Sequence, residues 1–312
     1  MFISLYIGII SGIGFTQTSL LGILLTLTLL LIGGLIAGYS LYSIERKYRG
    51  VRVKLRTYVV GSLVVFTYYY LIFLIIFSFP VFSLSVKIKL ILLNSLFLLA
   101  IFITYTSPMA KRMSRKAKRV PEDLSNKIEK LKKDMGVEDA EVYVIDLDDR
   151  KVANAMQVGA RGRYIFISSY LLKNLNLEEN LAVIAHELAH IKFRHVAKTA
   201  FLVYPMLIIG MNIFVLLPLF PLSKANTLLL QVVAIWIPIL FIILGVPIIR
   251  RSFETQADVE AAKYVGSKNM ISALEKLSDL ALIPRNVSRY WNLWHPSIDM
   301  RIKKLYTLKN ND

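Results

Sequence analysis

The stretch from Glu178 to Val196 reads EENLAVIAHELAHIKFRHV and contains the pattern H-E-x-x-H at His186, Glu187 and His190. It is predicted to form a helix, with acidic residues in its first turn and Asn176 as the candidate N-cap. Residues four apart lie on one helical face, so both imidazoles can point a ring nitrogen at one ion. Neutral imidazoles suit Zn²⁺, and Glu187 can take a proton from a water that the ion activates.

Chance is the alternative explanation, in which a helix simply carries two surface histidines. The whole chain has only 4 histidines, and two of them fall at this spacing with a glutamate in place, so a zinc site is favoured. His195 lies five residues after His190, about 140° around a continuous helix, and is not expected to bind the same ion. A role near the helix end is favoured for it.

The sequence ETQAD at 254–258 offers a third protein ligand, which a catalytic zinc usually needs beside its open position. On a helix, Glu254 and Asp258 share a face. Glu254 is the candidate ligand, and Asp258 is placed to hold the second ring nitrogen of a ligand histidine. The alternative is a solvated acidic patch that pairs with Arg250 and Arg251, which is less favoured once the histidine pair is considered.

Composition points to a membrane protein, since 55% of the 312 residues are apolar and the mean hydropathy is +0.55. There is no cysteine, which excludes disulfides and cysteine-based chemistry. The net charge of +17 lies largely beside apolar runs, so contact with anionic lipid headgroups is favoured over nucleic acid, for which no binding motif is visible.

Five uncharged stretches are long enough to cross a bilayer. Within the first, one span is predicted over Leu20–Tyr42, and the preceding 19 residues form either a short extra pass or an apolar lead-in. The stretches contain no Asp, Glu, Lys, Arg or His, which disfavours a proton- or metal-coupled carrier. They are Met1–Ile44, Thr57–Val86, Leu90–Ala110, Thr199–Ser223 and Ala225–Ile249.

Basic clusters after the first, third and fifth stretches predict a cytoplasmic face in a multi-pass protein of the cell membrane. We therefore expect an N-terminal transmembrane region of three or four spans (1–110), a cytoplasmic catalytic part (111–198), a transmembrane helical hairpin (199–249) and a cytoplasmic helical part with the third ligand (250–312). The clusters are Arg46, Lys47, Arg49, Arg52, Lys54 and Arg56, then Lys111, Arg112, Arg115, Lys116, Lys118 and Arg119, then Arg250 and Arg251.

The cytoplasmic catalytic part is predicted to be α+β. Pro121–Met135 is typical of a polar helix, and Glu141–Ile145 alternates like a strand. Asn154–Val158 and Tyr164–Ser168 are predicted to pair across a turn at Gly159–Gly162. The expected fold class is thus an α-helical multi-pass membrane protein whose α+β, HExxH (zincin, gluzincin-like) metalloprotease domain is split around a transmembrane hairpin.

The split arrangement resembles the HtpX-like membrane zinc metalloproteases, whose wider family includes the CAAX prenyl endopeptidases. The likeness runs from about Pro121 to the C-terminus and rests on HELAH at 186–190, two intervening spans and ETQAD at 254–258. It implies Glu254 as zinc ligand and Asp258 as the orienting residue. It also implies that His295, followed by Pro296, and Arg301 stabilise the oxyanion. This chain departs from the family at the N-terminus, where HtpX-like proteins typically have two spans.

The same likeness implies that Asn154 and Ala155 lie on an edge strand that holds substrate in extended form, for which main-chain hydrogen bonds are suited. We therefore expect an endopeptidase with one Zn²⁺ per chain that cleaves membrane or membrane-associated proteins at the cytoplasmic face, with a quality-control role implied by the family. Its partners would be protein or peptide substrates and the bilayer, not nucleic acid. The alternatives are a CAAX prenyl endopeptidase-like enzyme and a non-catalytic membrane scaffold with a structural metal site.

Overall fold

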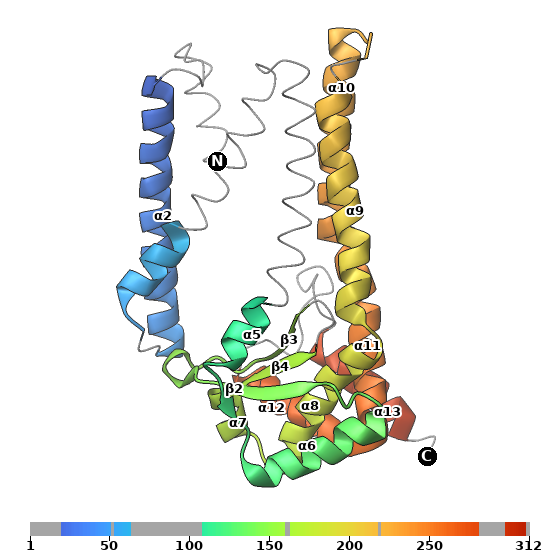
Figure 1. Ribbon diagram of the computed structural model, residues 1–312. Helices are drawn as coiled ribbons and strands as arrows, with labels where there is room; N and C mark the ends of the chain where they lie inside the picture. Colours follow the sequence, from blue (N-terminus) through green and yellow to red (C-terminus); the bar gives the residue numbers. More distant parts are fainter. Residues whose placement is uncertain are drawn as a thin grey trace. The chain divides into compact units, whose positions relative to one another are not determined.

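The computed structural model describes residues 20–50, 53–63, 108–159, 163–217, 220–280 and 297–309. The chain divides into two compact units, Met1–Lys89 with Asp149–Lys151, and Leu90–Asp148 with Val152–Asp312 (Figure 1). In the first unit, α2 (Leu20–Arg49) contains the predicted first span and packs on a helix over 55–63. A Cβ on Gly38 would lie 2.7 Å from the Cα of Val59, so this contact needs glycine. Most of the second and third apolar stretches lies outside the described residues.

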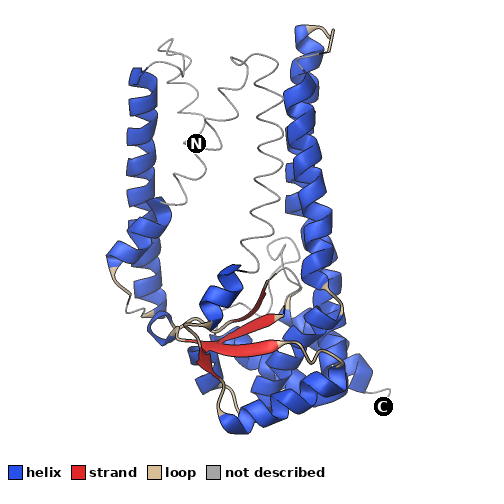
Figure 2. Cartoon of the chain, viewed as in Figure 1, coloured by secondary structure: helices blue, strands red, loops and turns tan. Residues whose placement is uncertain are grey.

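A four-stranded sheet with the order β1-β2-β4-β3 lies in the second unit (Figure 2). Strands β2 and β4 are parallel, while β1 and β3 run antiparallel to their neighbours. The predicted strand pair is confirmed, and part of its turn, 160–162, lies outside the described residues. The strands are β1 (Lys118–Arg119), β2 (Glu141–Ile145), β3 (Ala155–Val158) and β4 (Tyr164–Ser168). The order leaves β3 at one edge, and no other strand in the described part of the chain pairs with it.

Helices cover this sheet and form most of the second unit. The predicted polar helix is α6, and a 3₁₀ turn (Asp148–Arg150) and α7 lie on either side of the β3–β4 pair in sequence. The helices of the catalytic part are α5 (Pro108–Ser114), α6 (Glu122–Met135), α7 (Ser169–Asn174) and α8 (Leu177–Lys192). The later helices are α9 (His195–Leu216), α10 (Lys224–Leu240), α11 (Val246–Val265), α12 (Ser267–Leu280) and α13 (Ile298–Lys309).

Helix α8 carries the H-E-x-x-H pattern and begins where the sequence predicts. The Asn176 side chain accepts from the backbone N–H of Glu179 at 2.8 Å, and the Glu179 carboxylate accepts from the backbone N–H of Asn176 at 2.8 Å. The expected C-terminal end at Val196 is wrong, because α8 ends at Lys192. Arg194 then adopts a left-handed conformation with φ 55°, which breaks the helix and starts α9 in a new direction.

Helix α10 continues through a π-helical turn, η4 (Phe241–Gly245), into α11 without a break in the helix. Pro238 and Pro247 flank this turn, and each lacks the N–H of a regular helical hydrogen bond. Among the described residues, Ala225–Val265 is the one helix long and apolar enough to cross a membrane, and the apolar helix His195–Gly210 is shorter. The five predicted crossings therefore remain a prediction.

Small side chains let α8 and α11 approach closely in the core of the second unit. Ala185 and Ala189 of α8 and Ala257 and Ala261 of α11 are all fully buried. Helices pack about 8–10 Å apart depending on the side chains between them, and alanines allow the closer end of that range. The two helices that carry the candidate ligands are thereby held face to face.

Candidate active site

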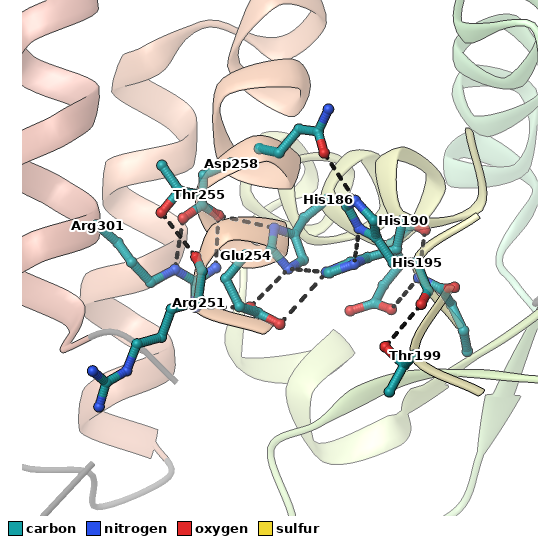
Figure 3. Close-up of polar contacts among 12 residues, drawn as sticks. His186, His190, His195, Thr199, Arg251, Glu254, Thr255, Asp258 and Arg301 are labelled. Atoms are coloured by element: carbon teal, nitrogen blue, oxygen red, sulfur yellow. Dashed lines mark hydrogen bonds and ion pairs between the residues drawn. The ribbon is translucent and has the colours of Figure 1, made fainter. Parts of the chain in front are cut away.

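Three candidate ligands from two helices converge in the structure, as Figure 3 shows. His186 and His190 extend from α8 and Glu254 from α11, and one ligand atom from each lies within 4.8 Å of the others. The two Nε2 atoms are 3.1 Å apart, and the Glu254 carboxylate oxygens lie 3.5 Å from Nε2 of His186 and 3.7 Å from Nε2 of His190. A pair of imidazoles and one carboxylate is a donor set that fits a catalytic zinc.

Asp258 lies one helical turn beyond Glu254 and faces His186. Its Oδ1 is 2.9 Å from Nδ1 of His186, although the ring N–H does not point directly at this oxygen, so the contact is mainly electrostatic. The Arg301 guanidinium of α13 donates to both Asp258 oxygens, at 2.7 and 2.6 Å, and lies 3.7 Å from Glu254. Arg301 thus joins α13 to the acidic residues of α11, and its contact with an oxyanion stays a prediction.

The pKa values of His186 and His190 are shifted in opposite directions. Burial lowers the pKa of His186, but the contacts with Asp258 and Glu254 outweigh burial and raise that pKa to about 10. Burial lowers the pKa of His190, and the nearby His186 lowers it further, to about 3. The pair of carboxylates therefore favours a cation beside His186, while His190 is neutral at pH 7 and keeps one unprotonated ring nitrogen.

Glu187, the predicted general base, faces the edge strand β3. Burial raises the pKa of its carboxyl group, and the nearby Glu254 carboxylate adds to this rise. His186 and a hydrogen bond from Gln157 lower the pKa, but the net shift is upward. Gln157 Nε2 donates to the backbone oxygen of Glu187 at 2.8 Å and to its Oε2 at 3.2 Å. Gln157 lies 30 residues before Glu187 in the sequence and belongs to no recognisable motif, so its place on a predicted strand was the one signal of such a contact.

The predicted substrate residues are located at the start of β3. Ala155 is the first residue of the strand, and the exposed Asn154 directly precedes it, with its backbone oxygen accepting from the N–H of Ser168 at 2.9 Å. Because Gln157 lies on the same strand and contacts Glu187, this strand runs alongside the candidate base. His295 lies outside the described residues.

The position of His195 differs from the one that a continuous helix predicts. The estimate that it points about 140° away from His190 assumed a continuous helix, and the break at Arg194 removes that assumption. The structure places Nδ1 of His195 2.7 Å from Nδ1 of His190, the nitrogen that does not face Glu254. His195 is therefore not among the candidate ligands but lies directly behind one of them.

Together, the fold and this site define a metalloprotease, with an H-E-x-x-H helix and a carboxylate supplied by a later helix. The chain belongs to peptidase family M48, whose family model matches residues 118–309. That range contains every candidate residue discussed above, and it confirms the resemblance at the level of this family.

Two known proteins are similar to this chain. The CAAX prenyl protease 1 homolog of Arabidopsis thaliana is 27% identical over 203 residues, which cover 61% of this chain and 48% of that protein. The chain thus spans about half the length of this curated relative. The crystal structure of S. mikatae Ste24p is similar with a TM-score of 0.55 and 19% identity, over 82% of this chain and 67% of that one. The second likeness shows a shared fold.

Proposed function

We propose that this chain is a zinc-dependent membrane endopeptidase that hydrolyses peptide bonds of membrane or membrane-associated proteins at the cytoplasmic face, in protein quality control. One observation carries the proposal. Glu254, which follows the α9–α10 helical pair in sequence, meets His186 and His190 closely enough for all three to hold one cation. Membership of peptidase family M48 supports the same chemistry.

Each residue then has a distinct task. His186, His190 and Glu254 would hold the zinc ion. When bound, zinc polarises the scissile carbonyl and lowers the pKa of the attacking water. Glu187 accepts a proton from that water as its oxygen bonds to the carbonyl carbon, and it returns the proton to the amine nitrogen as the C–N bond breaks. A raised carboxyl pKa suits both transfers, because the group must bind the proton and then release it.

Substrate binding is proposed at the open edge of β3, where a peptide can add as an extended strand through main-chain hydrogen bonds. Asn154 and Ala155 would contact the substrate there, within reach of the base that Gln157 holds. His295 and Arg301 would stabilise the oxyanion, as proposed from the family resemblance.

Membrane location is supported by the helix Ala225–Val265 and by its apolar side chains that face outward. Leu229, Trp236, Ile237 and Ile248 are each more than half exposed, which suits contact with lipid and not with water. We propose the multi-pass topology and the cytoplasmic position of the site from the distribution of basic residues.

Activity can be tested by measuring cleavage of casein by the purified protein in detergent, with and without a zinc chelator. Glu187→Gln should reduce kcat by at least about 10²-fold, the range attributed to general acid–base catalysis, while bound zinc remains. Glu178→Gln is the matched control, because Glu178 is an exposed glutamate in the first turn of the same helix. Activity that survives both the chelator and Glu187→Gln refutes the proposal.

Topology can be tested with single cysteines, since the natural chain has none. Lys130→Cys on α6 and Ala225→Cys at the far end of the hairpin both replace exposed residues. In intact cells, a membrane-impermeant maleimide should label the second variant and not the first. Labelling of Lys130→Cys before lysis would place the catalytic part outside the cytoplasm.

The quality-control role can be tested by measuring the half-life of a misassembled membrane protein in cells. That half-life should be shorter in cells that express the wild-type chain than in cells that express Glu187→Gln.

A CAAX prenyl endopeptidase-like activity is the second candidate, favoured by the match to the Arabidopsis protein of that name. The two candidates separate with three substrates: casein, a prenylated CAAX peptide, and the same peptide without its prenyl group. Cleavage confined to the prenylated peptide supports the second candidate, whereas cleavage of casein supports the first.

A further inference from the structure

His195 is buried behind the candidate metal site and contacts both helices that supply it. Only 3% of its surface is exposed. Its Nδ1 lies 2.7 Å from Nδ1 of His190, and its Nε2 lies 3.0 Å from Oε1 of Gln256 on α11. Its ring stacks on Phe253, the residue before Glu254, with centroids 4.1 Å apart and planes at 8°.

The contact between His190 and His195 requires a single proton between two nitrogens. Two ring nitrogens 2.7 Å apart form a hydrogen bond only when one carries hydrogen and the other presents a lone pair. The direction of this bond decides which nitrogen of His190 is bare, because a neutral imidazole holds one hydrogen.

Gln256 settles that direction. Its amide oxygen can only accept, so Nε2 of His195 carries the hydrogen and Nδ1 of His195 is bare. His190 therefore donates from Nδ1, and its own Nε2 keeps the lone pair. This Nε2 is the atom that faces Glu254 at 3.7 Å. The reverse direction would place hydrogen on Nε2 and prevent His190 from binding an ion.

We propose that His195 is a positioning residue that holds His190 in its metal-binding tautomer, with Gln256 fixing the tautomer of His195 in turn. The inference rests on the proposed zinc function. His195 thereby contacts the outer nitrogen of His190 by a hydrogen bond, whereas Asp258 contacts the outer nitrogen of His186 mainly through its charge. The break at Arg194 allows this contact, because a continuous helix would place His195 about 140° around the axis from His190.

Two substitutions separate positioning from packing. His195→Phe keeps a ring for Phe253 to stack on but removes the acceptor. His195→Asn loses the ring but can present its side-chain oxygen near the position of Nδ1. The measurement is the zinc dissociation constant, determined by competition with a chromogenic chelator on the full-length protein in detergent.

Positioning predicts that His195→Phe weakens zinc binding about 10–100-fold, as loss of such an outer partner typically does, while His195→Asn stays closer to the wild-type value. Packing alone predicts the opposite order. The proposal is overturned if His195→Phe binds zinc as tightly as the wild type, or if His195→Asn binds no more tightly than His195→Phe.

If the His195 variants fail to fold, the exposed Gln256 offers a second pair. Gln256→Glu keeps an acceptor and should bind zinc like the wild type, whereas Gln256→Met should bind more weakly. Equal affinity of this pair would overturn the proposal. The zinc titration of the wild type distinguishes failure of the proposed function from failure of the role of His195. Absence of zinc binding by the wild type rejects the proposed function itself. Tight wild-type binding with unaffected variants rejects only the role of His195.

Discussion

Arg301 should stabilise the second unit through its buried ion pair with Asp258. Its side chain is 9% exposed and donates two hydrogen bonds to Asp258, whose side chain is 3% exposed. Arg301→Met removes this partner and leaves the buried Asp258 carboxylate with His186 as its remaining partner among those described above. Removal of one member of a buried ion pair costs about 3–5 kcal/mol, and we expect that loss in the free energy of unfolding.

The assay is denaturant unfolding of the metal-free protein in detergent, monitored with a spectroscopic probe in the second unit. Lys303→Met is the matched control, because Lys303 is an exposed base on the same helix, and it should change stability by less than about 0.5 kcal/mol. Asp258→Asn completes a double-mutant cycle. The double variant should cost less than the sum of the single variants by at least about 2 kcal/mol, because the second substitution no longer strands a charge. Additive effects, or a loss below about 1 kcal/mol for Arg301→Met, would refute the reasoning.

Three further predictions concern the scaffold and the metal. Burial raises the pKa of Glu179, but hydrogen bonds from Lys276, Ser272 and the backbone lower it overall, so its ionised form stabilises the fold above about pH 4.5. Glu179→Gln should therefore cost about 1–2 kcal/mol at pH 7 in thermal unfolding, and the difference should vanish as the pH falls below the lowered pKa; a constant difference would contradict this. Gly210→Leu should lower the free energy of unfolding by about 1–3 kcal/mol, because a Cβ there would lie 2.6 Å from a backbone oxygen of α10. Gly61→Ala should not lower it, because a Cβ at Gly61 would have no heavy atom within 4 Å. Zinc at 100 times its dissociation constant should stabilise the wild type by about 2.7 kcal/mol in the same assay, reversibly by chelation, and a full response in Glu254→Gln would argue against that ligand.

Local sequence signals were sufficient for the elements that carry the site. The helix start at Asn176 was predictable because a capping box satisfies backbone donors through two side chains only three positions apart. The shared face of Glu254 and Asp258 followed from helical periodicity, and the structure places both beside the histidines. Strands β2, β3 and β4 followed from alternation and from β-branched and aromatic residues.

Contacts between distant segments were not predictable in the same way. The break at Arg194 has no local signal, since a left-handed arginine is unfavourable by itself and is held by the burial of His195 against Phe253 and His190. The contact of Gln157 with Glu187 depends on which face of β3 meets α8. That choice is made by the pairing of β3 with β4, which periodicity within one strand does not determine.

The formal charges around the site match a divalent cation. Glu187, Glu254 and Asp258 carry three formal negative charges and Arg301 carries one formal positive charge, which leaves a formal remainder of −2 for these four side chains when the histidines are neutral. A divalent cation matches that remainder, whereas a proton on His186 compensates only half of it, which is the state that the raised pKa of His186 describes. Glu254 and Asp258 lie on α11, Glu187 lies on α8 and the Arg301 guanidinium lies on α13, so packing of these three helices assembles the charges around one point.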